Sequence, residues 1–437
     1  MASIEQLYSV LATASSDQQD TAQPALVVHA GQIAVDTPAV ASEMTNSDLQ
    51  NWFLESPDVE AVAIVKENVP VALVNRNVFM EQYGRPFSRE VFGKRSCLSF
   101  ANQEPLIVGA DTPIEVVVRA AVEPESRVMK DGFICNRDGR YFGIGSGMAL
   151  IRAMSDIEAA KTRQLLSSIE YASAIQQSNL RNSQAELTAC LPSARLEWLP
   201  RDVVGGDCYF FRATRNGLFG AIVDCTGHGV PGAFMTLITL SFLENRVATG
   251  SDEPDPAHVL SDLNRYIKKV LGQHASAKSG EEAHVVREGK SDDGLDAFMF
   301  VLTGNGLDLQ YASARLEMAV LDGGATGPAE ATDVRILEGD RMGVGYSDTP
   351  DDFAFTTRSH TLQPGYRAFV TTDGVIDQVG GPKNIAHGRK RLYKLFAERR
   401  DERPQQFGDT LLDSFAQWQG DQHRRDDVCF FVFTNEV

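Results

Sequence analysis

The second half of the chain alternates short apolar runs with polar turns, and longer segments of helical periodicity lie between them. Runs rich in β-branched and aromatic residues that are bounded by turn residues predict strands. The expected strands cover 196–199, 218–223, 297–302, 307–311 and 318–321, and the expected helices cover 231–249, 256–271, 388–399 and 404–418. Mostly antiparallel strands with helices outside them predict a layered α+β sandwich.

The first part of the chain, residues 1–154, shows one short pattern of elements twice. The expected elements are a helix at 47–53, strands at 59–65 and 71–74, a helix from 75, a strand at 106–108, a helix at 114–122 and strands at 132–135 and 141–145. Asn46 or Ser47 is the expected N-cap of the first helix. The repeated pattern resembles a tandem CBS-type regulatory pair. That resemblance implies either an adenine-nucleotide ligand or a pair that serves only dimerisation.

Between the two parts, the composition changes to helix-forming residues. No glycine or proline occurs from 155 to 187, and apolar residues recur at helical spacing at Leu165, Ile169, Ala172 and Ile175. We expect a helix that either carries a signal, through rearrangement of a homodimer, or is a passive spacer. The predicted organisation is a CBS-like domain at 1–154, a helical linker at 155–190 and a catalytic domain at 191–437.

Charge and composition narrow the class of partner. The chain of 437 residues has a formal net charge of -18, which argues against nucleic acid and anionic membranes. It lacks the pattern of a signal peptide, and no apolar run approaches the roughly 18 residues of a membrane span. The six cysteines show no Cys-x-x-Cys spacing, which is typical of a reducing compartment. We therefore expect a cytoplasmic protein. The polar stretch 272–294 predicts a mobile loop.

Four aspartates stand at the ends of apolar runs, near glycine or a second aspartate. Asp207 occurs in GGDCYF, Asp224 in DCTGHG, Asp373 in TTDG and Asp426 in RRDDVCF. Turn chemistry accounts for any one of them alone. Together they offer carboxylate oxygens, and no His/Cys cluster has metal-ligand spacing. This donor set predicts a site for Mg²⁺ or Mn²⁺ rather than zinc.

The order of these four motifs resembles the bacterial PP2C-type serine/threonine phosphatases of the sporulation and stress-response group, over about 171–437. The resemblance implies a four-layer α-β-β-α sandwich and two divalent cations, Mn²⁺ or Mg²⁺. By resemblance, Asp224 bridges the two cations. Asp207 and the backbone carbonyl of Cys225 complete one cation site, and Asp373 and Asp426 hold the other.

Three further residues receive weaker roles. His228 lies between two glycines in the second motif, where it either protonates a leaving serine oxygen or supports the loop. Asp296 heads an apolar strand and is an additional candidate ligand. Asp427 is expected to support the site rather than to bind metal.

The resemblance also implies a substrate. The segment 372–381 is similar to a subgroup whose substrate is a phosphoserine or phosphothreonine on a small anti-sigma-antagonist-like protein. Three departures from the family pattern bear on substrate preference: Phe210 and Phe211 stand where an acidic residue is common, Cys429 stands where threonine is usual, and 311–315 replaces a glycine-histidine turn.

Two competing functions come from other classes. A pseudophosphatase that binds a phosphorylated partner without turnover would have nearly the same sequence. A diguanylate cyclase is suggested by the residues before Cys208, but the acidic residue that such a site uses is missing, and Asp224 and Asp373 would have no role. Neither Cys208 nor Cys225 begins a Cys-x5-Arg signature, which argues against a thiol phosphatase.

Overall fold

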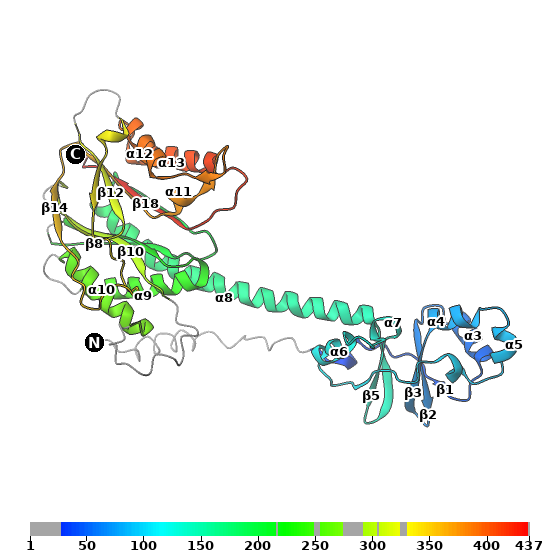
Figure 1. The fold of residues 1–437 in the computed structure, drawn as a ribbon. Helices are drawn as coiled ribbons and strands as arrows, with labels where there is room; N and C mark the ends of the chain where they lie inside the picture. Colours follow the sequence, from blue (N-terminus) through cyan, green and yellow to red (C-terminus); the bar gives the residue numbers. More distant parts are fainter. Residues whose placement is uncertain are drawn as a thin grey trace, which may run out of the picture. The chain divides into compact units, whose positions relative to one another are not determined.

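A computed structural model describes residues 28–215, 217–248, 254–273, 292–303, 306–323 and 330–435. It divides into an N-terminal unit, Met1–Leu166, and a C-terminal unit, Ser167–Val437. The long helix α8, Gly147–Cys190, contributes residues to both units (Figure 1). The predicted linker helix is therefore present but begins earlier than 155. Within the described residues, no helix is long and apolar enough to span a membrane. The predicted loop at 272–294 lies, apart from its ends, outside these residues.

The N-terminal unit contains the predicted repeat of elements. Its first half comprises α2 (Ala30–Ile33), β1 (Val40–Ala41), α3 (Asn46–Glu55), β2 (Ala61–Lys66), β3 (Val69–Asn75), α4 (Arg76–Tyr83), α5 (Ser88–Phe92) and η1 (Cys97–Phe100). Its second half comprises β4 (Ile107–Gly109), α6 (Ile114–Ala121), α7 (Val128–Asp131), β5 (Phe133–Arg137), β6 (Arg140–Gly145) and the start of α8. In both halves the first two strands pair in parallel and the last two pair antiparallel. The CBS assignment of this repeat stays a prediction.

A helix cap and a shared hydrophobic core stabilise the N-terminal unit. The N-cap of α3 is Thr45, whose side chain accepts from the backbone N–H of Asp48, rather than the predicted Asn46 or Ser47. Asn46 is instead fully buried and donates its amide to the carbonyl of Phe92 at 2.8 Å. Leu73 from the first sheet packs in one cluster with Ile134 from the second. The two halves therefore bury their sheets against each other.

The C-terminal unit contains two five-stranded sheets in which every neighbouring pair is antiparallel. The first has the order β14-β11-β10-β9-β8 and the second β13-β12-β15-β18-β7. The strands are β7 (Arg195–Leu199), β8 (Asp207–Ala213), β9 (Gly217–Cys225), β10 (Leu295–Thr303), β11 (Asp308–Ala314), β12 (Glu317–Leu321), β13 (Arg335–Glu338), β14 (Arg358–Thr361), β15 (Arg367–Thr371) and β18 (Val428–Phe433). Between β15 and β18 along the chain, β16 (Val379–Gly380) and β17 (Ile385–Ala386) form a separate two-stranded sheet.

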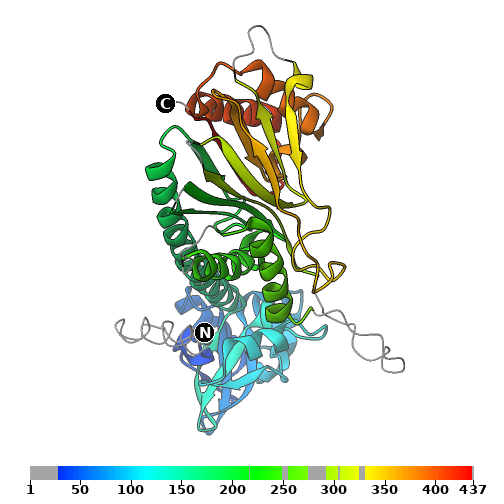
Figure 2. The same ribbon diagram turned by 90° about the vertical axis from the view of Figure 1, so that its left-hand side faces the viewer.

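Helices cover the outer face of each sheet. Helices α9 (Gly229–Ala248) and α10 (Pro256–Leu271) pack on the first sheet, and α12 (Arg389–Glu398) and α13 (Pro404–Gln419) pack on the second (Figures 1 and 2). The short elements α11 (Gly374–Asp377) and η2 (Ala331–Asp333) complete the unit. The predicted four-layer α-β-β-α sandwich is confirmed.

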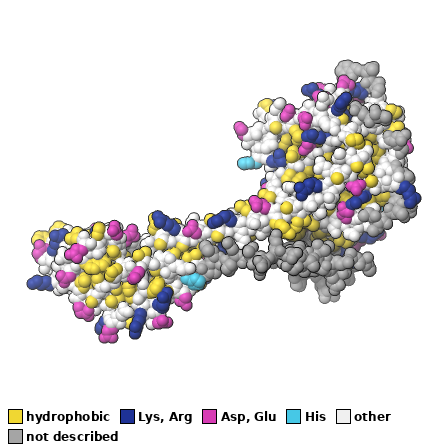
Figure 3. Space-filling model, turned by 180° about the vertical axis from the view of Figure 1, so that it is seen from behind, with side chains coloured by type: hydrophobic (Ala, Val, Ile, Leu, Met, Phe, Trp, Pro, Cys, Tyr) yellow, Lys and Arg dark blue, Asp and Glu magenta, His cyan; other side chains and the backbone are white. Residues whose placement is uncertain are grey.

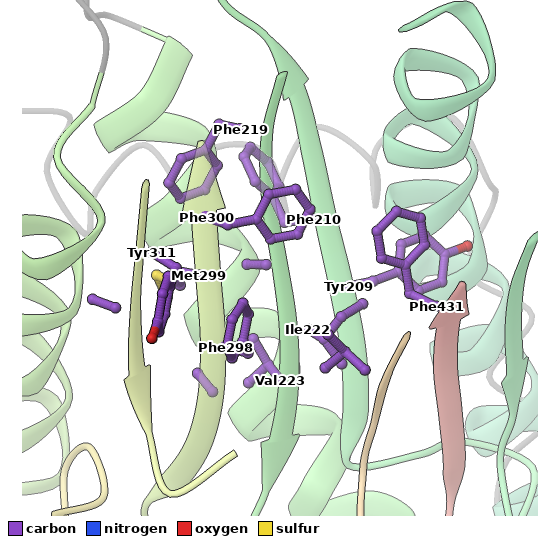
Figure 4. Close-up of a cluster of buried hydrophobic side chains, with 14 of the residues drawn as sticks. Tyr209, Phe210, Phe219, Ile222, Val223, Phe298, Met299, Phe300, Tyr311 and Phe431 are labelled. Atoms are coloured by element: carbon purple, nitrogen blue, oxygen red, sulfur yellow. The ribbon is translucent and has the colours of Figure 1, made fainter. Parts of the chain in front are cut away.

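Aromatic side chains fill the space between the sheets. The Phe211 and Phe431 ring centroids lie 5.0 Å apart, and those of Phe300 and Phe433 lie 5.9 Å apart. Figure 4 shows Phe300 and Phe431 among these buried side chains. Because Phe210 and Phe211 are almost completely buried, the departure from an acidic residue at this point of the sequence serves packing of the core.

Charges of both signs lie side by side on the face shown in Figure 3. On that face, Lys and Arg side chains are interspersed with Asp and Glu over the described surface of each unit.

Candidate active site

Three aspartates stand in a row across neighbouring strands of the first sheet. Asp207 opens β8 and pairs in register with Asp224 near the end of β9, and Asp224 pairs with Asp296 near the start of β10. Directly opposite residues of antiparallel strands point to the same face, with Cβ atoms roughly 5 Å apart. Opposed like charges destabilise a sheet, so ionising all three carboxyls of this row is unfavourable without a nearby cation.

The second sheet brings two more aspartates to this edge. Asp373 follows β15, and its backbone N–H lies 3.4 Å from the Oδ2 atom of Asp224, to which it donates. The preceding Thr372 donates its hydroxyl to Oδ2 of Asp207 at 2.6 Å. Asp426 precedes β18 and accepts from the N–H of Asp427 at 2.9 Å. The fold thus brings Asp207, Asp224, Asp373 and Asp426 to one edge, and their role as metal ligands stays a prediction.

The carboxylates perturb one another. Burial, followed by the charge of Asp224, raises the pKa of Asp207 well above its usual range. Burial and then Asp373 raise the pKa of Asp224 in the same way. Asp373 lies at the open edge, where desolvation and then the charge of Asp426 raise its pKa to about 6, partly offset by Arg389. Ionising these carboxyls together is therefore unfavourable unless a cation offsets their charge.

This donor set fits hard divalent cations. The converging groups are carboxylate oxygens, which are the ligands that such cations prefer. Among the described residues, no group of three or more His, Cys, Asp or Glu side chains is arranged as a cage of ligands that could hold a metal ion. Mg²⁺ does not require such a cage, because it commonly keeps several waters and takes only one or two carboxylates.

The loop before Asp207 can pass close to the second motif only because Gly206 has no side chain. A Cβ atom there would lie 2.2 Å from the carbonyl oxygen of Gly227 and 3.0 Å from that of Cys225. The carbonyl of Cys225 therefore faces this loop. Asp427, which is 1% exposed, accepts from the N–H of Gly206 at 2.5 Å and holds the loop from the other side.

Helix α8 also holds this loop, through Gln176, a residue for which the sequence predicts no role. Gln176 is 1% exposed. Its Nε2 donates to the carbonyl of Gly205 at 2.7 Å and to the hydroxyl of Thr236 at 2.8 Å, and its Oε1 accepts from the N–H of Gly205 at 3.2 Å. The available signal was a polar residue four positions after Ala172, on the apolar stripe of the helix.

His228 stands beside the carboxylate row on a turn that requires glycine. Gly227 and Gly229 flank it with φ of 84° and 65°. Its Nδ1 lies 2.9 Å from Oδ2 of Asp202, and both side chains are about half exposed. An imidazole whose Nδ1 pairs with a carboxylate is oriented to offer Nε2 to a substrate. No feature of the sequence indicates Asp202 as its partner.

Arg315 places a cation beside Asp296. Its φ of 63° lies in the left-handed region, at the point where the family resemblance leads us to expect a glycine-histidine turn. Its Nη1 lies 3.5 Å from Oδ1 of Asp296, and its guanidinium lies 4.7 Å from the ring centre of Tyr346. Burial raises the pKa of Asp296 to about 6 in spite of Arg315. Asp296 therefore has a cationic partner within the protein, unlike Asp207 and Asp224.

Comparison with known families decides the class of this unit. The family model for SpoIIE, stage II sporulation protein E, matches residues 214–435, half of the chain. The chain belongs to the SpoIIE family. It is accordingly a PP2C-type phosphatase, and the predicted resemblance is confirmed. Membership in the SpoIIE family removes the basis for the diguanylate cyclase alternative. The N-terminal unit lies outside the matched residues.

A solved structure, the first of the two below, agrees with this assignment. The SiaA-PP2C domain of Pseudomonas aeruginosa is 27% identical, with a TM-score of 0.52 over 63% of this chain and 99% of that domain. The PP2C phosphatase domain of SpoIIE from Bacillus subtilis, solved with a fragment of its regulatory domain, is 16% identical, with a TM-score of 0.40 over 55% of this chain and 62% of that one. No curated protein matches the chain.

Proposed function

We propose that this SpoIIE-family protein hydrolyses phosphoserine or phosphothreonine on a small anti-sigma-antagonist-like protein in a bacterial signalling pathway, and that it requires two divalent cations, Mn²⁺ or Mg²⁺. The observation that carries the proposal is the meeting of Asp207, Asp224 and Asp373 from two sheets at one edge. The cost of ionising these carboxyls together supports a cation-dependent reaction, because a bound cation would offset it.

In this proposal, the two cations would be held by the carboxylates of Asp207, Asp224, Asp373 and Asp426 and the backbone carbonyl of Cys225. When bound, such cations supply a nucleophile from water at neutral pH and neutralise phosphoryl charge. Thr372 fixes the Asp207 carboxylate by its hydrogen bond to Oδ2.

His228 is the proposed proton donor to the leaving serine oxygen. Its pairing with Asp202 supports this role, because the carboxylate orients the imidazole. Burial does not restrict the ring, which is 44% exposed, so a phosphorylated side chain on a partner protein can reach it.

The N-terminal unit is proposed to regulate the phosphatase as a CBS-like pair. The repeated parallel and antiparallel strand pairing supports the assignment. A nucleotide ligand and a purely dimerising pair remain the two alternatives for its role. A homodimer accords with either alternative, and α8 is the covalent connection from this unit to Gln176.

The deciding experiment is hydrolysis of an aryl phosphate and a phosphoserine peptide with added Mn²⁺ or Mg²⁺. We expect metal-dependent turnover that falls at least about 100-fold in Asp224→Ala and Asp373→Ala. Asp421→Ala removes an exposed carboxylate elsewhere on the unit and should retain wild-type turnover. Full metal binding by the wild type without turnover of either substrate would instead favour the pseudophosphatase.

A further inference from the structure

A small pocket opens beside the carboxylate row. It lies between the start of β12, the end of β15 and the first turns of α12. Its lining residues are Leu316, Glu317, Phe369, Thr371, Asp373, Ile376, Arg389 and Tyr393. Asp373 belongs to both the pocket and the proposed cation site, so a group held at that site lies next to the pocket.

A fixed cation stands in this pocket. Nε of Arg389 lies 2.8 Å from Oε1 of Glu317, and the hydroxyl of Tyr393 donates to the same oxygen. Glu317 is 22% exposed, whereas Arg389 is 59% exposed. Glu317 therefore restrains the arginine side chain at one nitrogen and leaves most of its surface open to solvent.

Helix stability does not account for a cation at this position. Helix α12 begins with Arg389, Lys390 and Arg391, and its first turn contains no acidic residue. Cations at a helix N-terminus oppose the macrodipole, which favours negative charge there. An exposed ion pair such as Arg389–Glu317 also adds little to stability. Residues that oppose the stability of their own helix, and that do not stabilise the fold in another way, are often found at functional positions.

The planar guanidinium suits one ligand chemistry in particular. Arginine donates several N–H groups in a fork that matches the oxygens of a phosphoryl group. A phosphorylated substrate brings a dianion to an edge rich in carboxylates, and a cation placed beside that edge offsets their repulsion.

We propose that Arg389, held by Glu317 and Tyr393, binds the phosphoryl group of the substrate. This assignment rests on the proposed phosphatase function of the same site. Glu317 and Tyr393 act as positioning residues, because they reach the substrate only through Arg389.

The test compares Arg389→Ala and Arg389→Lys with Lys390→Ala, which removes an exposed cation from the same helical turn but not from the pocket. In metal-containing buffer we measure KM and kcat for an aryl phosphate and a phosphoserine peptide, together with inhibition by inorganic phosphate. Arg389→Ala should raise KM for both substrates and weaken phosphate inhibition by about 10- to 100-fold, the loss of one charge-assisted contact. Arg389→Lys should recover part of this loss, and Lys390→Ala should change each value less than about twofold.

Glu317→Gln tests the positioning role. It removes the charge that restrains Arg389 and should raise KM by less than Arg389→Ala does, with thermal unfolding checked in parallel. The proposal is overturned by equal KM and phosphate inhibition in Arg389→Ala and Lys390→Ala. It is also overturned if only peptides with an acidic residue beside the phosphoserine lose affinity, because Arg389 would then read the flanking carboxylate.

A failure of the phosphatase function would be recognised separately. In that case the wild type would show no turnover, but calorimetric titration with inorganic phosphate in the presence of Mn²⁺ still compares the wild type with Arg389→Ala. Weaker phosphate binding in the variant supports the pocket, and equal binding refutes it.

Discussion

The contact of Gln176 with the Asp207 loop gives the sharpest test of how the site is held. Gln176→Leu keeps a side chain of similar length but removes three hydrogen bonds to Gly205 and Thr236. A buried hydrogen bond contributes about 1 kcal/mol net, and each buried backbone group left without a partner costs about 1–3 kcal/mol. We therefore expect the free energy of unfolding of the C-terminal unit to fall by about 2–4 kcal/mol. Its melting temperature should fall by roughly 5–15 °C.

Tryptophan fluorescence during guanidinium unfolding measures this loss close to the site. The indole N–H of Trp198 donates to the carbonyl of Asp207 at 2.8 Å. Gln177→Leu is the matched control: Gln177 is exposed, its one hydrogen bond, to Ser173, is long at 3.3 Å, and its loss should cost less than about 0.5 kcal/mol. Mn²⁺ affinity should also fall about tenfold in Gln176→Leu, because the loop that carries Asp207 is no longer fixed. Equal stability of the two variants would refute the reasoning. Lost stability with unchanged Mn²⁺ affinity would show that the hydrogen bonds of Gln176 support only the fold and not the metal site.

Two further predictions concern proton transfer and metal binding. His228→Asn should slow hydrolysis of a phosphoserine peptide at least about tenfold. Hydrolysis of an aryl phosphate should slow far less, because that leaving group needs no proton. If a steady-state assay shows that both substrates slow equally, His228 supports the loop instead. The raised pKa of Asp373, about 6, means that the metal-free folded state holds a proton that the unfolded chain releases near pH 4. Stability of the metal-free protein should therefore fall as pH rises from about 4 to about 6. Since cations require the deprotonated carboxylate, the rise in melting temperature with Mn²⁺ should be larger at about pH 7.5 than at about pH 5.5, and equal shifts would contradict this account.

Local signals in the sequence predict the elements of the C-terminal unit well. Helix α10 matches its predicted bounds because Asp255 caps it, Pro256 opens it and Gly272 ends it in a left-handed conformation with φ of 66°. Helix α8 begins earlier than predicted. Its first residue, Gly147, packs so closely on Met129 that a Cβ atom would lie 2.7 Å from the carbonyl oxygen of Met129. Such a contact between separate elements leaves no pattern in the local sequence.

The sequence by itself determined which residues could serve a metal-dependent phosphatase. Carboxylates at the ends of apolar runs, the glycines beside them and the order of the motifs are all local features, and they identify Asp207, Asp224, Asp373 and Asp426. The order of the motifs was enough for the resemblance to the family, which implied the four-layer sandwich, while the strand and helix periodicities predicted its elements.

Only the tertiary structure decided how these residues meet and what holds them. Asp373 contacts Asp224 across 149 positions of sequence, and Arg389 pairs with Glu317 from another layer. The Gln176 contacts with Gly205 join a helix to a loop in the same way. Such contacts depend on strand register and on how the two sheets pack, which are set by side chains throughout the core rather than by the residues of the site.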